Sequence, residues 1–488
     1  MKKFSHYILL LFFLSLVACT ERVIDATQLN EKPVLYPDYV DVTIPYNIAP
    51  LNFQLDDMEG VDWVDVVLKG SRSGDIHVST RRLVDFDKQE WKELVNKNKG
   101  GEIIVTLSCR KADKWYSYKP FKIYVSGDKI DHSVVYRRIQ YGYEAVCEIG
   151  LYETRLDSHN DRLMIKGGCF NCHTSNRCNP KQSMWHFRSA QGRGVGATAV
   201  ITGDSVMMLD TKTNETSGGF VYGYWHPSGR YIAYALTGPR CFIPLCEEPV
   251  DEFDTFADLV IYDVKTNEII KDERFTTRDF FNAPAFSPDG KTLYFSYSKN
   301  KYMPVNYKEL DYDLLSVSFD EKTGKLGDKV DTLFRASTMG KSVSFARPSY
   351  DGKYILFALC GYGMLSVYNK DSDLWLYDVR KKKARALTEV NTDESESFHN
   401  WSSTSKWIVF SSRRDDGFYA RLYFAHIDSK GRFSKPFMLP KKDPKTFYGD
   451  FTGIYSVPEF ATAPTPLSRR EIKARLFEGG RKKVRVRH

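Results

Sequence analysis

The sequence predicts an all-β protein in which a small N-terminal β-sandwich is followed by a β-propeller of six blades. Short runs of alternating apolar and polar residues, separated by turn residues, extend over most of the 488-residue chain. Tyrosine and phenylalanine, which favour strands, number 30 and 31. A turn-and-strand phrase also recurs four times between residues 225 and 410, as in propeller blades. Five or seven blades would also agree with this repeat.

The N-terminus predicts export. Lys2 and Lys3 precede an apolar run, Tyr7–Ala18, that is too short to span a bilayer as a helix. The run ends Leu16-Val17-Ala18-Cys19, which resembles a bacterial lipobox and implies cleavage before Cys19 and lipidation of its thiol. The alternative is a plain signal peptide, 1–18, with a chance cysteine. Thr20 favours the outer membrane, but the sequence does not predict whether the periplasmic or the surface face.

A polar tether, 19–37, precedes the sandwich domain, 38–130. The segment near Lys88 to Lys97 places Trp91 and Leu94 on one face, which predicts a helix packed against the strands. We find no catalytic constellation in this domain and expect it to act as a spacer or a docking unit. The expected strands are Val40–Ile44, Trp63–Leu68, Glu102–Leu107 and Phe121–Val125.

The region 134–460 predicts the propeller. Gly229, Gly290, Gly352 and Ser405 fall in register at spacings of 61, 62 and 53 residues, and each belongs to a tight turn followed by an alternating strand. A blade buries both faces of its sheet only when neighbours stack around an axis. Two less regular units complete the ring, and a last strand closes it. These are 149–165, 197–210 and 455–460.

The repeated phrase Ser287-Pro288-Asp289-Gly290-Lys291 resembles TolB-type (PD40) propeller repeats. The mature chain resembles exported Bacteroidetes propeller lipoproteins labelled TolB-like or cytochrome c biosynthesis-like. The resemblance implies a cell-envelope protein and partners in outer-membrane uptake or envelope assembly. The fourth turn departs from the pattern because it lacks both proline and glycine. The matching stretches are Val42–Leu51, Cys169–His173, Gly340–Phe345, Ser411–Arg414 and Val457–Phe460.

The motif Cys169-Phe170-Asn171-Cys172-His173 is the only C-x-x-C-H in the chain. In an exported protein it is the attachment signature of a c-type haem, with two thioethers and a proximal histidine on the iron. His173 is thus the candidate metal ligand, and Met184 and His186 are candidates for the sixth position. We expect the motif in a loop-like insert, 166–190, of the propeller.

Three alternatives compete with haem. Cys178 could form a disulfide with Cys169 or Cys172. The same three cysteines and a histidine could hold zinc. Cys169 and Cys172 could also form a redox dithiol, although no thioredoxin-type pattern surrounds them. The absence of a helical segment near the motif weighs against a cytochrome domain.

The formal net charge of +8 comes mostly from the C-terminal tail, 461–488. Between Arg469 and Arg487, nine Lys and Arg residues face two Glu, a net charge of +7. This tail either remains solvated or contacts anionic lipid. The exported context and the lack of a basic-aromatic platform exclude a nucleic-acid-binding function.

No nucleophile elbow, zinc-protease helix or phosphate loop is present in the sequence, so we do not expect an enzyme. The sequence predicts a lipid-anchored β-propeller of the cell envelope that acts as a protein-interaction or scaffold module of an outer-membrane system. The alternative is a mono-haem electron carrier that uses Cys169, Cys172 and His173.

Overall fold

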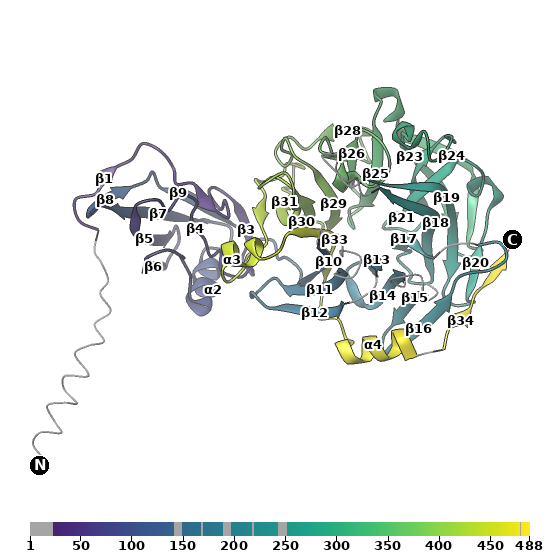
Figure 1. The fold of residues 1–488 in the computed structure, drawn as a ribbon, viewed down its shortest axis with the longest axis horizontal. Helices are drawn as coiled ribbons and strands as arrows, with labels where there is room; N and C mark the ends of the chain where they lie inside the picture. Colours follow the sequence, from purple (N-terminus) through teal and green to yellow (C-terminus); the bar gives the residue numbers. More distant parts are fainter. Residues whose placement is uncertain are drawn as a thin grey trace, which may run out of the picture.

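A computed structural model describes residues 23–140, 149–166, 169–188, 197–216, 219–242, 251–478 and 480–488. The predicted signal peptide and Cys19 lie outside the described residues. The chain forms a small N-terminal β-domain beside a ring of six β-sheets (Figure 1). No helix among the described residues has the length and apolar character needed to cross a membrane.

The N-terminal domain is built on a seven-stranded sheet, with a separate two-stranded pair, β2 and β4. Strands β5 and β7 form its centre over ten residues each, and each of the four predicted runs overlaps an observed strand. The bounds are β1 (Thr27–Gln28), β2 (Leu35–Tyr36), β3 (Thr43–Pro45), β4 (Gln54–Leu55), β5 (Val61–Gly70), β6 (Asp75–Thr80), β7 (Glu102–Lys111), β8 (Lys114–Ser117) and β9 (Phe121–Ser126).

The helix predicted in this domain is confirmed as α2 (Lys88–Lys97). The carboxylate of Asp87 accepts hydrogen bonds from the backbone N–H groups of Gln89 and Glu90, which caps the helix at its first turn. Trp91, Leu94 and Val95 are buried against the sheet. The helix therefore covers one face of the small domain, as its apolar spacing predicts.

The second domain is a six-bladed propeller, which confirms the predicted fold (Figure 1). Each blade is an antiparallel four-stranded meander, and blades 2 and 3 each gain one further strand. The first four blades are β33–β10–β11–β12, β13–β16, β17–β20 and β21–β24, and the last two are β25–β28 and β29–β32.

The blade strands are β10 (Ser133–Gln140), β11 (Ile149–Arg155), β12 (Asp161–Lys166), β13 (Cys169–Asn176), β14 (Asn179–Arg188), β15 (Ala197–Thr202), β16 (Ser205–Asp210), β17 (Val221–Trp225), β18 (Tyr231–Phe242), β19 (Asp251–Asp263), β20 (Glu268–Ile270), β21 (Phe280–Phe286), β22 (Thr292–Ser298), β23 (Asp313–Asp320), β24 (Lys325–Phe334), β25 (Ser342–Pro348), β26 (Tyr354–Cys360), β27 (Asp373–Asp378), β28 (Lys383–Ala386), β29 (Glu396–Trp401), β30 (Trp407–Ser412), β31 (Arg421–His426), β32 (Phe437–Met438) and β33 (Gly453–Ala461). Short helices connect some of them: α3 (Pro444–Gly449), η4 (Glu273–Phe275), η5 (Tyr307–Glu309), η6 (Ser337–Met339) and η7 (Ser366–Tyr368).

The ring closes where the predicted last strand returns to the first blade. Strand β33 is antiparallel to β10, with Ser133 opposite Ala461 and Val134 opposite Phe460. The first blade therefore combines a strand from the end of the propeller sequence with three strands from its beginning. This pairing fixes both ends of a ring whose other neighbours are held by side-chain packing.

The four tight turns of the sequence repeat share one backbone conformation. Gly229, Gly290 and Gly352 each have φ of 73°, and Ser405 has φ of 58°. Glycine enters this left-handed region without the steric cost that a Cβ atom imposes. Ser405 shows that the fourth turn keeps the geometry of the others although it lacks their sequence.

The C-x-x-C-H motif does not lie in a loop-like insert. It lies at the start of β13, the inner strand of blade 2, and β14 is the next strand of the same sheet. The expected insert, 166–190, therefore supplies half of a regular blade. The sequence obscured these strands because the segment is rich in Gly, Asn and Ser and carries few of the branched apolar residues that mark strands.

The C-terminal tail is ordered on the outside of the ring, contrary to the expected solvated end. Helix α4 (Arg469–Glu478) leads to two short strands, β34 (Lys482–Lys483) and β35 (Arg485–Arg487). These strands pair in parallel with β16 and β20, the outermost meander strands of blades 2 and 3. Ile472 and Val484 are buried between the tail and the blades, which explains why the tail is held.

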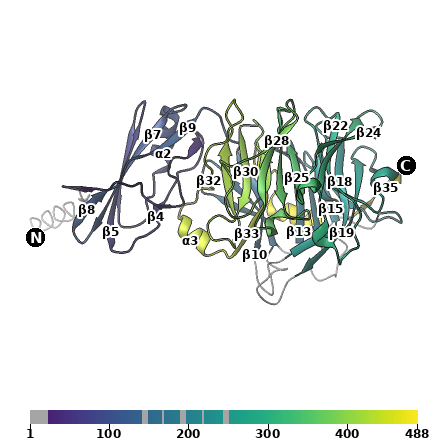
Figure 2. The ribbon, with the colours of Figure 1, turned by 90° about the horizontal axis from the view of Figure 1, so that it is seen from above.

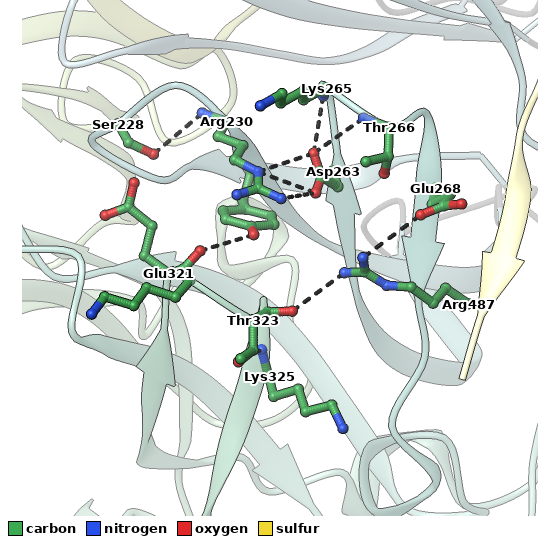
Figure 3. A network of polar contacts seen from close by, with 12 residues as sticks. Ser228, Arg230, Asp263, Lys265, Thr266, Glu268, Glu321, Thr323, Lys325 and Arg487 are labelled. Carbon is green, nitrogen blue, oxygen red and sulfur yellow. Dashed lines mark hydrogen bonds and ion pairs between the residues drawn. The ribbon is translucent and has the colours of Figure 1, made fainter.

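The charges of the tail meet acidic partners on the propeller (Figure 3). Arg487 approaches Glu268 at 3.7 Å and donates to the backbone oxygen of Thr323 at 3.4 Å. Arg485 also pairs with Glu268, at 3.1 Å. Beside them, Arg230 binds buried Asp263 at 2.8 Å. Much of the tail's positive charge near its end is thus used within the molecule.

The N-terminal domain contacts blade 6 directly. Tyr39, which is fully buried, donates to the Met438 oxygen at 3.3 Å, and the Trp407 indole donates to the Asp128 oxygen at 3.3 Å. Asp131 accepts from the Ser403 N–H at 2.7 Å. The two domains therefore share a packed interface (Figure 2).

We predict that deleting residues 480–488 exposes the edges of β16 and β20. An unpaired strand edge is a template for association, so the shortened protein should unfold at a lower temperature and form dimers or larger species in size-exclusion chromatography. The matched control is Glu268→Gln, which removes two exposed ion pairs but keeps the strands, and such pairs contribute at most about 1 kcal/mol. A truncated protein that stays monomeric with an unchanged midpoint would contradict this role.

Candidate functional site in the propeller channel

The inner strands of the propeller share a β-bulge. In five of the six inner strands, one residue has a positive φ angle: Tyr222, Ala283, Phe345, Phe398 and Val457, at 53°, 44°, 52°, 43° and 49°. The register against the neighbouring strand shifts at the same places. Strand β13 shows its own shift, between Cys169 and Cys172. Positive φ is uncommon for residues other than glycine, and a bulge changes where a side chain points.

The bulge residues form a plug across the channel. The rings of Tyr222 and Phe345 lie 5.2 Å apart, and those of Phe345 and Phe398 also lie 5.2 Å apart. Ala283 and Val457 belong to the same apolar cluster. We call these five residues the channel plug. They come from five blades, so the plug forms only when the ring is complete.

A small cavity with a mixed polar and apolar lining adjoins the plug. It has a volume of about 50 Å³, which is room for a few water molecules or one small ion. We call it the channel chamber. Besides plug residues, its walls include Arg137, Cys172, His173, Arg347, Asn400 and Glu459.

Arg347 is the most unusual member of this wall. Arg347 is only 9% exposed. Its guanidinium donates a hydrogen bond to the backbone oxygen of Ala346 at 3.3 Å. The rings of Tyr224 and Phe345 lie 5.4 and 5.8 Å from it. Among the described residues, no carboxylate lies within 4 Å of this guanidinium. Burial lowers its pKa, but an arginine stays charged in proteins.

Glu459, on the neighbouring part of the wall, is engaged elsewhere. It accepts hydrogen bonds from the N–H and the hydroxyl of Ser175 at 2.8 and 3.2 Å. Burial raises the pKa of its carboxyl group to about 7. Near neutral pH a large share of Glu459 is therefore uncharged, so this group does not fully compensate Arg347.

His173 is a buried, neutral histidine. Its ring is hydrogen-bonded to the backbone of Val135 in blade 1, and its Nε2 atom is buried without a partner. Burial lowers its pKa to about 4. Counted from the bulge of each inner strand, His173 stands at the same position as Trp225 in blade 3 and Trp401 in blade 6. It therefore fills a packing position between blades.

The predicted haem ligands do not converge. Cys172 and His173 are successive residues of a strand, so their side chains point to opposite faces of the sheet. Cys172 accepts from the Tyr222 N–H of blade 3 at 3.2 Å, whereas His173 faces blade 1. A c-type haem needs both on the same porphyrin. The side chain of Cys169 lies outside the described part of the chain.

The candidates for the sixth iron ligand also face away from His173. Met184 packs toward blade 3, where a Cβ atom on Gly223 would lie 2.6 Å from its terminal methyl. His186 lies against Gly219 on the same side, and its Nδ1 contacts the Thr198 hydroxyl at 3.0 Å. The sheet stands between these residues and His173. The residues described here do not fit a haem, and we derive no chemistry through one.

The other cysteine sites are not assembled either. Cys178 is a buried thiol that forms no disulfide, and its sulfur lies 3.5 Å from the Trp401 oxygen. Burial raises its pKa well above the usual range, which disfavours a thiolate. Within the described ranges, no three His, Cys, Asp or Glu side chains are grouped as they would be around a metal.

Arg347 and Glu459 were not predicted from the sequence as site residues. Each lies two residues after a plug residue of its own blade. The two residues are recognised as equivalent positions only when the bulges of their strands are superimposed. Residues 344–347 and 456–459 share no sequence identity except a serine at the first position. The available signal was therefore a charged residue in an otherwise apolar inner strand.

The chain matches no protein-family model and no curated protein. Among solved structures it is similar to TolB from Acinetobacter baumannii, with 12% identity, a TM-score of 0.42, and 76% of this chain and 85% of that chain covered. It is also similar to the β-propeller domain of the Trilobed protease from Pyrococcus furiosus, with 12% identity, a TM-score of 0.33, and 67% and 79% covered. These similarities concern the propeller architecture alone.

We predict that the chain carries no covalent haem when it is produced in an exporting host that has the haem-attachment machinery. The opposed directions of Cys172 and His173 are the physical reason. Intact mass and a peroxidase stain of a denaturing gel measure the outcome, with a c-type cytochrome made in the same cells as the positive control. A haem-sized mass gain that is lost in Cys172→Ala would contradict the geometry.

We also predict that His173 makes the protein sensitive to acid. Its pKa is about 4 when folded and about 6.5 when unfolded, so unfolding takes up a proton between these values. The contribution of His173 to the free energy of unfolding is at its maximum above pH 6.5 and falls by about 3 kcal/mol as the pH decreases to 4. The variant His173→Phe should show a smaller decrease in unfolding midpoint between pH 7 and pH 4.5.

Glu459 titrates in the opposite sense, because its folded pKa of about 7 lies above its ordinary value. Its protonation favours the folded protein as the pH falls. Because Glu459 is present in both proteins, the comparison of wild type with His173→Phe isolates the effect of the histidine. Equal pH dependence in the two proteins would show that His173 is not buried and neutral.

Proposed function

We propose that the chain is a lipid-anchored binding module of the cell envelope, and that one face of its propeller receives a partner protein of an outer-membrane system. The lipobox-like segment that ends at Cys19 supports the anchor. The distribution of exposed apolar side chains on the propeller supports the binding role. The mono-haem alternative is not advanced, since its ligands do not converge.

The two faces of the propeller differ in construction. In an antiparallel meander, turns between the first and second strands lie at one face, and loops between the second and third strands lie at the other. The first are the tight turns around Gly229, Gly290 and Gly352. We call the second the loop face. It carries the longer segments 299–312, 361–372 and 413–420, together with the connections between blades.

The most exposed large apolar side chains of the propeller lie on the loop face. Tyr302 and Val305, in the long loop of blade 4, are 77% and 72% exposed. Phe418, in the corresponding loop of blade 6, is 73% exposed, and Met339, between blades 4 and 5, is 51% exposed. Aromatic residues and methionine are enriched at protein interfaces. This one-sided distribution is the observation that carries the proposed function.

Single exposed apolar residues are common on protein surfaces, so their placement matters more than their number. Two further large apolar residues of the described propeller are exposed: Val330, on the outer strand β24, at 40%, and Phe256, in β19, at 37%. Val330 lies away from the loops of the loop face. It provides a control position outside the loop face.

The docking role is tested by placing a photocrosslinking amino acid at Tyr302, Phe418 or Val330 of the full-length protein in its own cells. We predict that positions 302 and 418 yield cross-links to the same envelope protein, identified by mass spectrometry, and that position 330 does not. Tyr302→Asp should weaken the cross-link from position 418 several-fold, because it places a charge in a desolvated contact. Cys19→Ser in the same cells should move the chain out of the membrane fraction.

Cross-links that are absent, or that are equally strong at position 330, would contradict the loop face as the binding surface. Chain that remains membrane-bound after Cys19→Ser would contradict the lipid anchor but not the docking face. The two parts of the proposal can therefore fail separately.

A further inference from the structure

We propose that the channel chamber is a binding site for a small carboxylate, held by the guanidinium of Arg347 and the side-chain amide of Asn400. This site lies inside the ring and is independent of the docking of a partner on the loop face. It rests on three features of the chamber: an uncompensated buried cation, unused hydrogen-bond donors, and an apolar wall beside them.

The first feature is the charge of Arg347. Arg347 is only 9% exposed, so its charged side chain has lost much of its hydration, and such a loss is unfavourable unless a counter-charge or hydrogen-bond acceptors replace the water. Its side chain has one hydrogen bond in the structure, to Ala346, and no carboxylate of the described chain lies within 4 Å. Water in the chamber can replace part of the hydration, and an anion would replace more of it.

The acidic groups near the chamber do not fill this role. Glu459 accepts from Ser175 on blade 2 and lies beyond 4 Å from the Arg347 guanidinium, and its pKa of about 7 leaves it only partly ionised at neutral pH. Glu252 also lines the chamber, but it forms no ion pair with Arg347. The cation is therefore left with capacity for an external partner.

The second feature is a set of donors that converge on the chamber. Asn400 is 9% exposed and lines the chamber from blade 6, beside Arg347 of blade 5. Its Oδ1 atom accepts a hydrogen bond from the Trp401 N–H at 2.9 Å. Its NH₂ group donates no hydrogen bond to any of the described residues. Arg347 and Asn400 stand at equivalent positions of their inner strands, each two residues after a plug residue.

A planar guanidinium matches the two oxygens of a carboxylate in a bidentate arrangement. The Asn400 amide adds a further donor to the lining of the same chamber. A buried guanidinium with no carboxylate of the described chain within 4 Å, together with an amide donor, is the chemistry of an anion site.

The third feature favours a carboxylate over an inorganic oxyanion. The same chamber is lined by Phe345, Phe398 and Val457 of the plug, and by Leu365. A short aliphatic chain can contact this wall while its carboxylate contacts Arg347, as in ligand sites that combine apolar walls with a few polar groups. Phosphate would require donors on every side. The volume of about 50 Å³ restricts the ligand to a few heavy atoms.

The test uses the purified mature chain and sodium salts of acetate, propionate, phosphate and chloride at one ionic strength. Ligand that binds only the folded protein raises its unfolding midpoint in proportion to occupancy. We expect acetate and propionate to give a saturable rise of ~2 °C, with heat of binding in a calorimetric titration. Phosphate and chloride should give no saturable rise.

Three variants locate the effect. Arg347→Gln removes the cation and should abolish the response. Asn400→Asp supplies a carboxylate inside the chamber, so it should raise the midpoint without ligand and also abolish the response. Arg380→Gln, at an exposed arginine of the same blade as Arg347, should respond like the wild type.

Several results would overturn the proposal. An equal response to all four salts would indicate a general ionic effect, and a response to phosphate alone would indicate an inorganic oxyanion site. No response to any salt would mean that water alone fills the chamber. If Arg347→Gln fails to fold, Asn400→Asp still decides, because retention of the carboxylate response in that variant contradicts binding at Arg347.

Discussion

The bulge in the inner strands is the constraint on which the channel depends. Six strands that meet around one axis leave a gap that regular pleating does not fill. Five of these strands contain a residue with positive φ, and four of the five carry a bulky side chain there: Tyr222, Phe345, Phe398 and Val457. The cost of this strained backbone is offset by apolar burial, because these side chains close the channel and pack against one another.

The same bulge determines where the charged residues of the channel lie. Arg347, Asn400 and Glu459 come two residues after a plug residue, so the geometry that closes the channel also delivers polar groups to one level beside the plug. Their burial separates the charge of Arg347 from solvent and raises the pKa of Glu459 to about 7. The chamber therefore combines charged and polar groups on one part of its wall with the apolar side chains of the plug on another.

The exterior of the ring shows how the remaining edges are managed. Strand β33 closes the first blade, and the tail adds β34 and β35 to the edges of blades 2 and 3. The N-terminal domain packs on blade 6 through Tyr39 and Asp131. Covered edges do not pair with other chains. The loop face carries the most exposed aromatic side chains of the described propeller, Tyr302 and Phe418.

The sequence by itself determined the all-β class, the helix α2, the repeating turns and the closing strand, because these depend on local spacing and turn chemistry. The repeat agreed with five, six or seven blades, and the sheet topology of the structure gives six. Only the tertiary structure decided the state of Cys172 and His173. Their spacing matches a haem motif, but in a strand successive side chains point to opposite faces. Likewise, Arg347 becomes a site residue only when strands from distant parts of the chain meet at one axis, since burial and missing partners are properties of the assembled ring.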